Sequence, residues 1–81
     1  MEILAVNPQA AVAAARVVVI TTPKSAPVQR LVRQAAKEGQ VVNLTQGKPR
    51  QAVLILDSGQ VVLAAVPADQ LIARWADPKS L

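Results

Sequence analysis

The sequence has 81 residues and contains no cysteine and no histidine, which excludes disulfides and metal centres built on cysteine or histidine. Apolar residues make up 52% of the chain, yet Trp75 is the only aromatic, so the core must be built from small and β-branched side chains. We therefore expect a single domain over residues 1–81, without a cofactor, that self-associates to bury more apolar surface.

The formal net charge of +4 is distributed unevenly along the chain. Residues 3–56 carry seven basic side chains and one acidic side chain, whereas the remaining residues have a net charge of −2. This segregation favours a polyanionic partner on one side of the molecule, and a basic solvated surface is the alternative.

The N-terminal apolar stretch lacks the basic start of a signal peptide and is interrupted by Pro8 and Arg16. No run of about 18 apolar residues is present, so we expect no membrane-spanning segment and no membrane partner. The expected location is the cytoplasm.

The first predicted element is a strand beginning at residues 3–6, followed by a turn at Asn7-Pro8. Residues 12–21 are predicted to return as a second extended stretch, best defined over the β-branched residues 16–20. Alanines 13–15 suit a helix equally well, which leaves the start of this stretch open.

A helix is predicted between Ser25 and Gly39. The Ser25 hydroxyl can accept from the free N–H groups of a first turn, Pro27 suits that turn, and Gly39 suits the C-terminal stop. Apolar residues follow with helical spacing and predict a buried stripe. The stripe comprises Val28, Leu31, Val32, Ala35 and Ala36.

Three further strands are predicted at residues 40–45, 50–57 and 60–66, with a two-residue hairpin at Ser58-Gly59 joining the last two. Residues 52–56 and 61–66 are apolar without alternation, which is typical of strands covered on both faces.

A second helix is predicted over residues 67–76, with Leu71, Ile72 and Trp75 on one side and a stop at Asp77-Pro78. Two short helices cover a small sheet incompletely, so we expect the remainder to face a neighbouring subunit. The predicted fold class is α+β, with a mostly antiparallel sheet and two helices.

The residues for proton transfer or nucleophilic attack are sparse. Asp57 is the residue expected beside a turn, Asp69 suits the first turn of a helix, and Ser25 is explained as a cap. We therefore expect no enzymatic activity and no small-molecule substrate.

The loop at residues 45–50 combines Gly47, Lys48 and Arg50 without an acidic residue. Glycine lets a ligand approach the backbone closely, and the two cations can reach neighbouring phosphates. The spacing differs from a P-loop, and without aromatics the loop is no platform for single-stranded bases. The loop therefore favours binding to the phosphate backbone of a nucleic-acid duplex. An ordinary solvated hairpin loop is the alternative.

Two stretches resemble the RemA family of extracellular-matrix regulatory proteins. Residues 16–20 read Arg-Val-Val-Val-Ile, and residues 23–30 read Pro-Lys-Ser-Ala-Pro-Val-Gln-Arg, where the family has Arg, four apolar residues, then Pro-Glu-Ser-Ala-Pro-Ile-Lys-Arg. The similarity continues without gaps over residues 12–76, through Asp57-Ser-Gly and Val61-Val-Leu-Ala-Ala-Val66.

The resemblance implies a bacterial DNA-binding transcription regulator of biofilm-matrix and osmoprotection genes. It also implies a domain like the LytTR DNA-binding fold, assembled into a ring-shaped homo-oligomer. Arg16 and Arg30 match basic residues of the family, and Pro27 matches a proline important for oligomerisation. The implied partners are double-stranded DNA and further copies of the chain.

The loop departs from the family, which carries Arg-Arg after the glycine where this chain has Lys48 and Pro49. Arg50 stands where threonine is usual, and Gln51 where arginine is usual. The DNA-binding candidates are therefore Arg16, Lys48, Arg50 and Arg30. An oligomeric scaffold without DNA binding is the alternative, and structured RNA is a third possibility.

Overall fold

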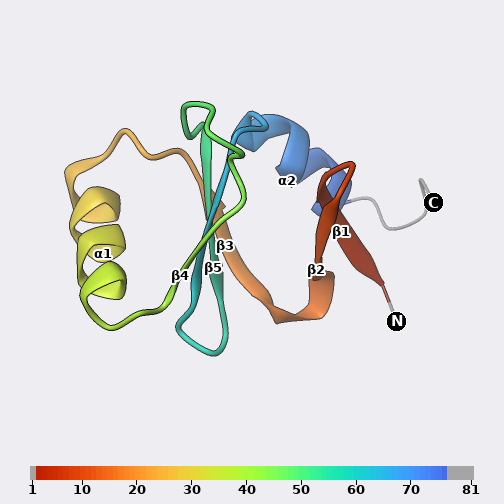
Figure 1. The fold of residues 1–81 in the computed structure, drawn as a ribbon. Coiled ribbons are helices and arrows are strands. Elements are labelled where there is room, and N and C mark those ends of the chain that lie inside the picture. The colour runs from red at the N-terminus through yellow and green to blue at the C-terminus, as the bar shows by residue number, and fades with distance from the viewer. Residues whose placement is uncertain (1, 77–81) are drawn as a thin grey trace.

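The computed structural model describes residues 2–76, which form six strands, two α-helices and one short 3₁₀ turn (Figure 1). In chain order these are β1 Ile3–Asn7, β2 Ala10–Ala13, the 3₁₀ turn η1 Ala14–Arg16, β3 Val17–Thr21, α1 Ala26–Lys37, β4 Val41–Asn43, β5 Ala52–Leu56, β6 Val61–Ala64 and α2 Ala68–Ala76.

The strands form a four-stranded sheet in the order β3-β5-β6-β4 and a separate β1–β2 hairpin. Strand β5 pairs antiparallel with both of its neighbours, whereas β4 pairs parallel with β6. The predicted α+β class with mostly antiparallel pairing and two helices is confirmed. The central strands β5 and β6 carry the apolar runs, as expected for strands without an exposed face.

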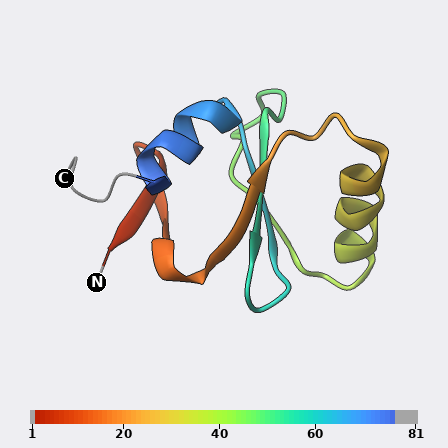
Figure 2. The ribbon, with the colours of Figure 1, turned by 180° about the vertical axis from the view of Figure 1, so that it is seen from behind.

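The sheet lies between α1 on one side and the β1–β2 hairpin with α2 on the other (Figures 1 and 2). Because side chains alternate along a strand, β5 sends Leu54 to the hairpin side and Val53 to the α1 side. Leu54 packs in a cluster with Leu4 and Leu71, while Val53 packs with Val32 of α1. The predicted covering of both faces is confirmed.

Helix α1 begins where the sequence predicts. The Ser25 side chain accepts from the Val28 N–H at 3.3 Å, and Gly39 has a φ of +69°, which favours glycine after the helix end. The predicted stripe was partly wrong: Val32 and Ala35 are buried, but Leu31 is 42% exposed and Ala36 is also exposed. The helix contacts the sheet along a narrower face than its apolar spacing indicates.

The single extended stretch predicted over residues 12–21 is two strands in different sheets. The 3₁₀ turn at Ala14–Arg16 separates β2 from β3 and carries the chain from the hairpin to the main sheet. The Ala14 N–H donates to the Glu2 carbonyl at 3.2 Å, so the run of small alanines adopts a tight turn against β1.

The β5–β6 connection is a three-residue loop, where the sequence predicted two residues. Leu56 faces Gln60, with the Leu56 N–H donating to the Gln60 carbonyl at 2.9 Å and the Gly59 N–H donating to the Leu56 carbonyl at 3.0 Å. Gly59 has a φ of +91°, so the loop is a turn closed by a left-handed glycine. Asp57 is thereby a loop residue.

Helix α2 buries Leu71 and partly buries Trp75, whose indole N–H donates to the Ala14 carbonyl at 3.2 Å. Ile72, predicted on the same side, is 43% exposed. The predicted stop at Asp77-Pro78 lies outside the described residues. Neither helix of residues 2–76 has the length and hydropathy to cross a membrane.

Candidate nucleic-acid interface

The loop between β4 and β5 projects from one end of the sheet, at the top of Figure 1. It is tied to β6 on both sides, because the Leu44 N–H donates to the Leu63 carbonyl at 2.9 Å and the Gln51 N–H donates to the Ala64 carbonyl at 2.8 Å. Residues 45–50 therefore extend beyond the sheet from two fixed points.

The loop turns sharply at Gln46-Gly47. Both residues have positive φ, +56° and +83°, and the Lys48 N–H donates to the Thr45 carbonyl at 3.1 Å, which defines a type I′ turn. The Asn43 carboxamide oxygen accepts from the Thr45 N–H at 3.0 Å and from its hydroxyl at 2.7 Å. Asn43 and the buried Thr45 thus hold the turn, and Lys48 follows it exposed.

Arg50 lines three neighbouring grooves, each with a different cation. A groove of about 380 Å³ places it with Arg33 of α1, and one of about 400 Å³ places it with Lys24. A third groove, of about 330 Å³, places it with Lys48. Arg50 therefore joins cations from three segments of the chain at one end of the sheet. We call Lys24, Arg33, Lys48 and Arg50 the loop-end cluster.

The loop-end cluster is weakly neutralised. Within the described part of the chain, Asp69 at the start of α2 is the only acidic residue that lines the three grooves. The one ion pair within residues 2–76 lies elsewhere, between Arg16 and Asp57. Four positive charges near one carboxylate make a surface that attracts anions.

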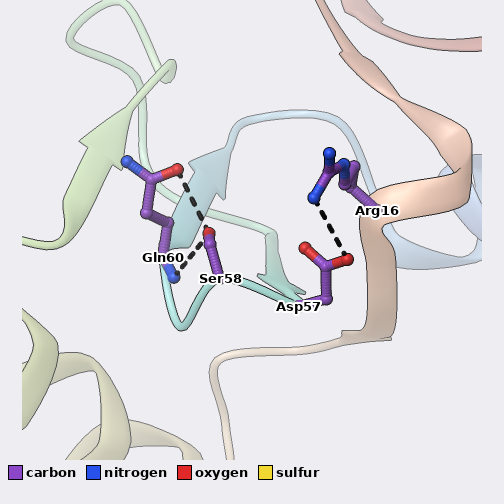
Figure 3. Close-up of polar contacts among 4 residues, drawn as sticks. All are labelled: Arg16, Asp57, Ser58 and Gln60. Carbon is purple, nitrogen blue, oxygen red and sulfur yellow. Dashed lines mark hydrogen bonds and ion pairs between the residues drawn. The ribbon is translucent and has the colours of Figure 1, made fainter.

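Arg16 lies at the opposite end of the sheet from the loop-end cluster. Strand β3 runs antiparallel to β5, with Val17 opposite Leu56 and Thr21 opposite Val53, so Arg16 is next to the β5–β6 loop. Its guanidinium is 3.5 Å from the Asp57 carboxylate (Figure 3). The strand separates the two sites by about 15 Å or more.

Arg30 lies apart from both groups. It lines a groove of about 480 Å³ between α1 and the β5–β6 loop, together with Glu38, Leu31 and Gly59. Pro27 is exposed in the first turn of α1. Of the four predicted DNA-binding residues, the structure therefore brings together only Lys48 and Arg50.

The sequence did not indicate that Lys24 and Arg33 lie near Arg50. Each belongs to a segment that already had an explanation, Lys24 in the turn before α1 and Arg33 on the polar face of the helix. They lie at least 17 positions before Arg50 in the sequence. No local pattern links them, because their proximity arises when α1 packs against the sheet.

The fold and its charged end define a small α+β protein with a concentrated cationic surface. A family model described as RemA-like, extracellular matrix regulatory protein A-like, matches residues 3–75. The chain belongs to this RemA-like family, which confirms the resemblance carried by its motifs.

Several bacterial relatives carry the name "Putative regulatory protein". One from Desulfatibacillum aliphaticivorans is 46% identical over 68 residues, which cover 84% of this chain and 76% of the relative. One from Synechococcus sp. strain JA-2-3B'a(2-13) is 41% identical over the same shares. One from Nitratidesulfovibrio vulgaris is 41% identical over 64 residues, covering 79% and 73%. The family and these names support a regulatory role.

Proposed function

We propose that this protein is a DNA-binding transcriptional regulator, of the biofilm-matrix or osmoprotection type, that holds duplex DNA by its phosphates. The observation that carries the proposal is the position of Arg50, which shares grooves with Lys24, Arg33 and Lys48. Arginine and lysine side chains at this density suit the closely spaced charges of a duplex backbone.

The contacts proposed for the loop-end cluster are with the DNA backbone and not with the bases. Helix α1 packs against the sheet, and the loop-end cluster consists only of arginines and lysines, which are the side chains that most often contact phosphates. Sequence preference then arises from the bendability of the DNA or from the spacing of repeated sites. Pro49 fixes one backbone dihedral between Lys48 and Arg50, which restricts the conformations that this part of the loop can adopt.

One protomer offers few cations, so affinity comes from repetition within a ring-shaped homo-oligomer of LytTR-like subunits. Exposed apolar side chains at both edges of the sheet support self-association: Val18 and Val19 on β3 and Val42 on β4 are between 38% and 57% exposed. In such a ring, Arg16 and Arg30 add further DNA contacts beyond the loop-end cluster. Pro27 contributes to the subunit contact.

The proposal includes a cytoplasmic location, where bacterial DNA lies, and no catalytic activity. Its partners are duplex DNA and other copies of the chain. Structured RNA is the competing polyanion, since the same cations reach RNA phosphates.

The test is fluorescence anisotropy of a labelled duplex with the wild-type protein, with Lys48→Ala/Arg50→Ala, and with Lys37→Ala as the control. Lys37 is an exposed lysine in the last turn of α1 and lines none of the grooves that Arg50 shares. We expect the double variant to lose most of the affinity and Lys37→Ala to keep it. Equal affinities for all three proteins contradict the proposal.

An oligomeric scaffold without DNA binding is the second candidate. Three observations favour it: Arg16 is distant from Arg50, Pro49 replaces a family arginine, and six large apolar side chains are exposed in residues 2–76. For a scaffold, the Lys48→Ala/Arg50→Ala variant supports normal function in cells and the wild-type protein binds no duplex even at low salt.

A further inference from the structure

A groove of about 410 Å³ lies on the hairpin side of the sheet, bounded by the β1–β2 turn, the loop after β4, and α2. Arg50 does not line it, and Lys48 is the only residue that it shares with the loop-end cluster. Its volume is in the range of small-molecule sites. It is therefore a distinct feature that touches the proposed DNA surface at one residue.

Of residues 2–76, two cations and no acidic residue line the groove. Lys48 lines it from the loop, and Arg74 lines it from α2. Neither side chain forms an ion pair with any of residues 2–76, where Arg16–Asp57 is the only pair. Two uncompensated positive charges across one groove favour an anion between them.

Arg74 is held at the wall of the groove. One of its guanidinium nitrogens, Nη1, donates to the Ala5 carbonyl at 2.9 Å, which ties the side chain to β1. A guanidinium has five N–H donors, so donors remain for a bound carboxylate or phosphate. The contact reduces the freedom that Arg74 must lose on binding a ligand.

The other residues that line the groove indicate what kind of molecule carries the anionic group. Val6, which is fully buried, and Val66 supply an apolar floor, while Asn7 lines the groove with a carboxamide already bonded to the Leu44 carbonyl at 3.1 Å. No aromatic residue lines the groove, so a nucleobase has no stacking partner there. The lining suits an anionic group on a compact apolar body.

The wall formed by the loop is preorganised. Gln46 lines the groove with a φ of +56°, a conformation that non-glycine residues seldom adopt, and its carboxamide donates to the Gln9 side chain across the groove boundary. Strained backbone of this kind persists where the surrounding contacts hold it, and it concentrates at ligand sites.

We propose that the groove between Lys48 and Arg74 binds a small organic anion, a carboxylate or phosphate monoester on a compact apolar body. A ligand in this groove engages Lys48 and competes with DNA for that cation. The coupling to DNA rests on the proposed function, whereas binding of the small anion does not. By linkage, the ligand lowers DNA affinity by the factor by which DNA lowers ligand affinity.

The test is an NMR titration of the backbone amides of the full chain with phenyl phosphate, benzoate and inorganic phosphate in turn. We expect saturable shifts at Asn7, Gln46 and Arg74 with phenyl phosphate or benzoate, and weaker binding of inorganic phosphate, which lacks the apolar body. Phenyl phosphate and benzoate separate the phosphate from the carboxylate source. Shifts centred on Arg33 and Arg50 with every probe, or no saturation with any, overturn the proposal.

Arg74→Gln and Lys48→Gln are each expected to weaken phenyl phosphate binding roughly tenfold, since each removes a charged donor. The matched control is Arg30→Gln, which makes the same charge change in a different groove and is expected to leave binding unchanged. Retained amide spectra verify that each variant is folded. If Arg74→Gln unfolds, Lys48→Gln still tests the proposal, because Lys48 lies in an exposed loop. Equal weakening by Arg30→Gln overturns the proposal.

Duplex binding is measured with and without phenyl phosphate at a concentration near its dissociation constant for the wild type, where a roughly tenfold weaker variant is largely unoccupied. We expect phenyl phosphate to lower the DNA affinity of the wild type but not that of Arg74→Gln. If Arg74→Gln weakens DNA binding as strongly as phenyl phosphate does in the wild type, Arg74 itself contacts DNA and the proposed competition through Lys48 alone is wrong. If the wild type binds phenyl phosphate but no duplex, the proposed DNA function fails while the groove stands.

Discussion

The Arg16 guanidinium and the Asp57 carboxylate face each other 3.5 Å apart (Figure 3). The Asp57 N–H also donates to the Arg16 carbonyl at 2.8 Å. The backbone bond fixes the two residues as neighbours across the end of the sheet. The side-chain pair is solvent-exposed, 68% for Arg16 and 46% for Asp57. Exposed pairs of this kind are weak, so a phosphate can replace Asp57 as the partner of Arg16.

Asp57→Asn is expected to strengthen duplex binding about twofold, because it frees Arg16 and removes a repelling charge. Anisotropy titrations of Asp57→Asn, Arg16→Gln and the double variant measure the effect. We expect the gain from Asp57→Asn to disappear when Arg16 is already Gln. A gain of the same size in both backgrounds indicates a general charge effect and contradicts a role for the pair.

Arg33→Gln is expected to weaken duplex binding more than Arg30→Gln. The two arginines lie on the same helix and the substitutions change charge equally, but Arg33 shares a groove with Arg50 whereas Arg30 shares one with Glu38. Removing a phosphate contact from each copy of an array costs affinity at every copy. Anisotropy at fixed low salt compares the two. A larger loss for Arg30→Gln argues that DNA lies against the β5–β6 loop.

Pro27→Ser is expected to reduce the size of the assembly. Serine is compatible with the first turn of α1, which Ser25 already caps, so the helix survives the change. Pro27 is exposed in the single chain, as a residue at a subunit contact must be. Light scattering coupled to size-exclusion chromatography measures the mass. An unchanged mass leaves Pro27 with only its role in opening the helix.

Leu54→Ala is expected to lower the free energy of unfolding by about 2–5 kcal/mol, because Leu54 is fully buried in the cluster between β5, β1 and α2. Leu31→Ala is the control, since Leu31 is 42% exposed and its truncation in the single chain costs about 0.5 kcal/mol or less. Urea unfolding at one protein concentration compares them. A small loss of stability for Leu54→Ala contradicts the core described for the single chain. A loss for Leu31→Ala as large as that for Leu54→Ala places Leu31 in a buried contact.

Local signals in the sequence predicted the local features of the fold well. The Ser25 cap, the Gly39 stop and the covered strands β5 and β6 each follow from residue types at fixed spacing. Features that depend on distant contacts were predicted less well. Leu31 has the spacing of a core residue, but α1 packs on the sheet through Val32 and Ala35 and leaves Leu31 exposed.

The candidate site shows the same division. Lys48 and Arg50 are neighbours in the loop and were predicted together, whereas Arg33 reaches Arg50 only through the packing of α1. Arg16 was predicted by resemblance to bind DNA together with the loop cations. The antiparallel pairing of β3 with β5 places it at the opposite end of the sheet. The groove between Lys48 and Arg74 has walls from segments tens of residues apart, so no motif could indicate it.

The most direct test of phosphate binding by an array of copies is the dependence of duplex affinity on salt concentration. The slope of log affinity against log salt is about −0.9 per phosphate neutralised, so the six cations proposed for one protomer, the loop-end cluster with Arg16 and Arg30, account for at most about −5.4. We predict a slope clearly steeper than this, reduced in magnitude by Arg50→Ala. A slope near zero, or one that a single protomer explains and Arg50→Ala leaves unchanged, contradicts the account.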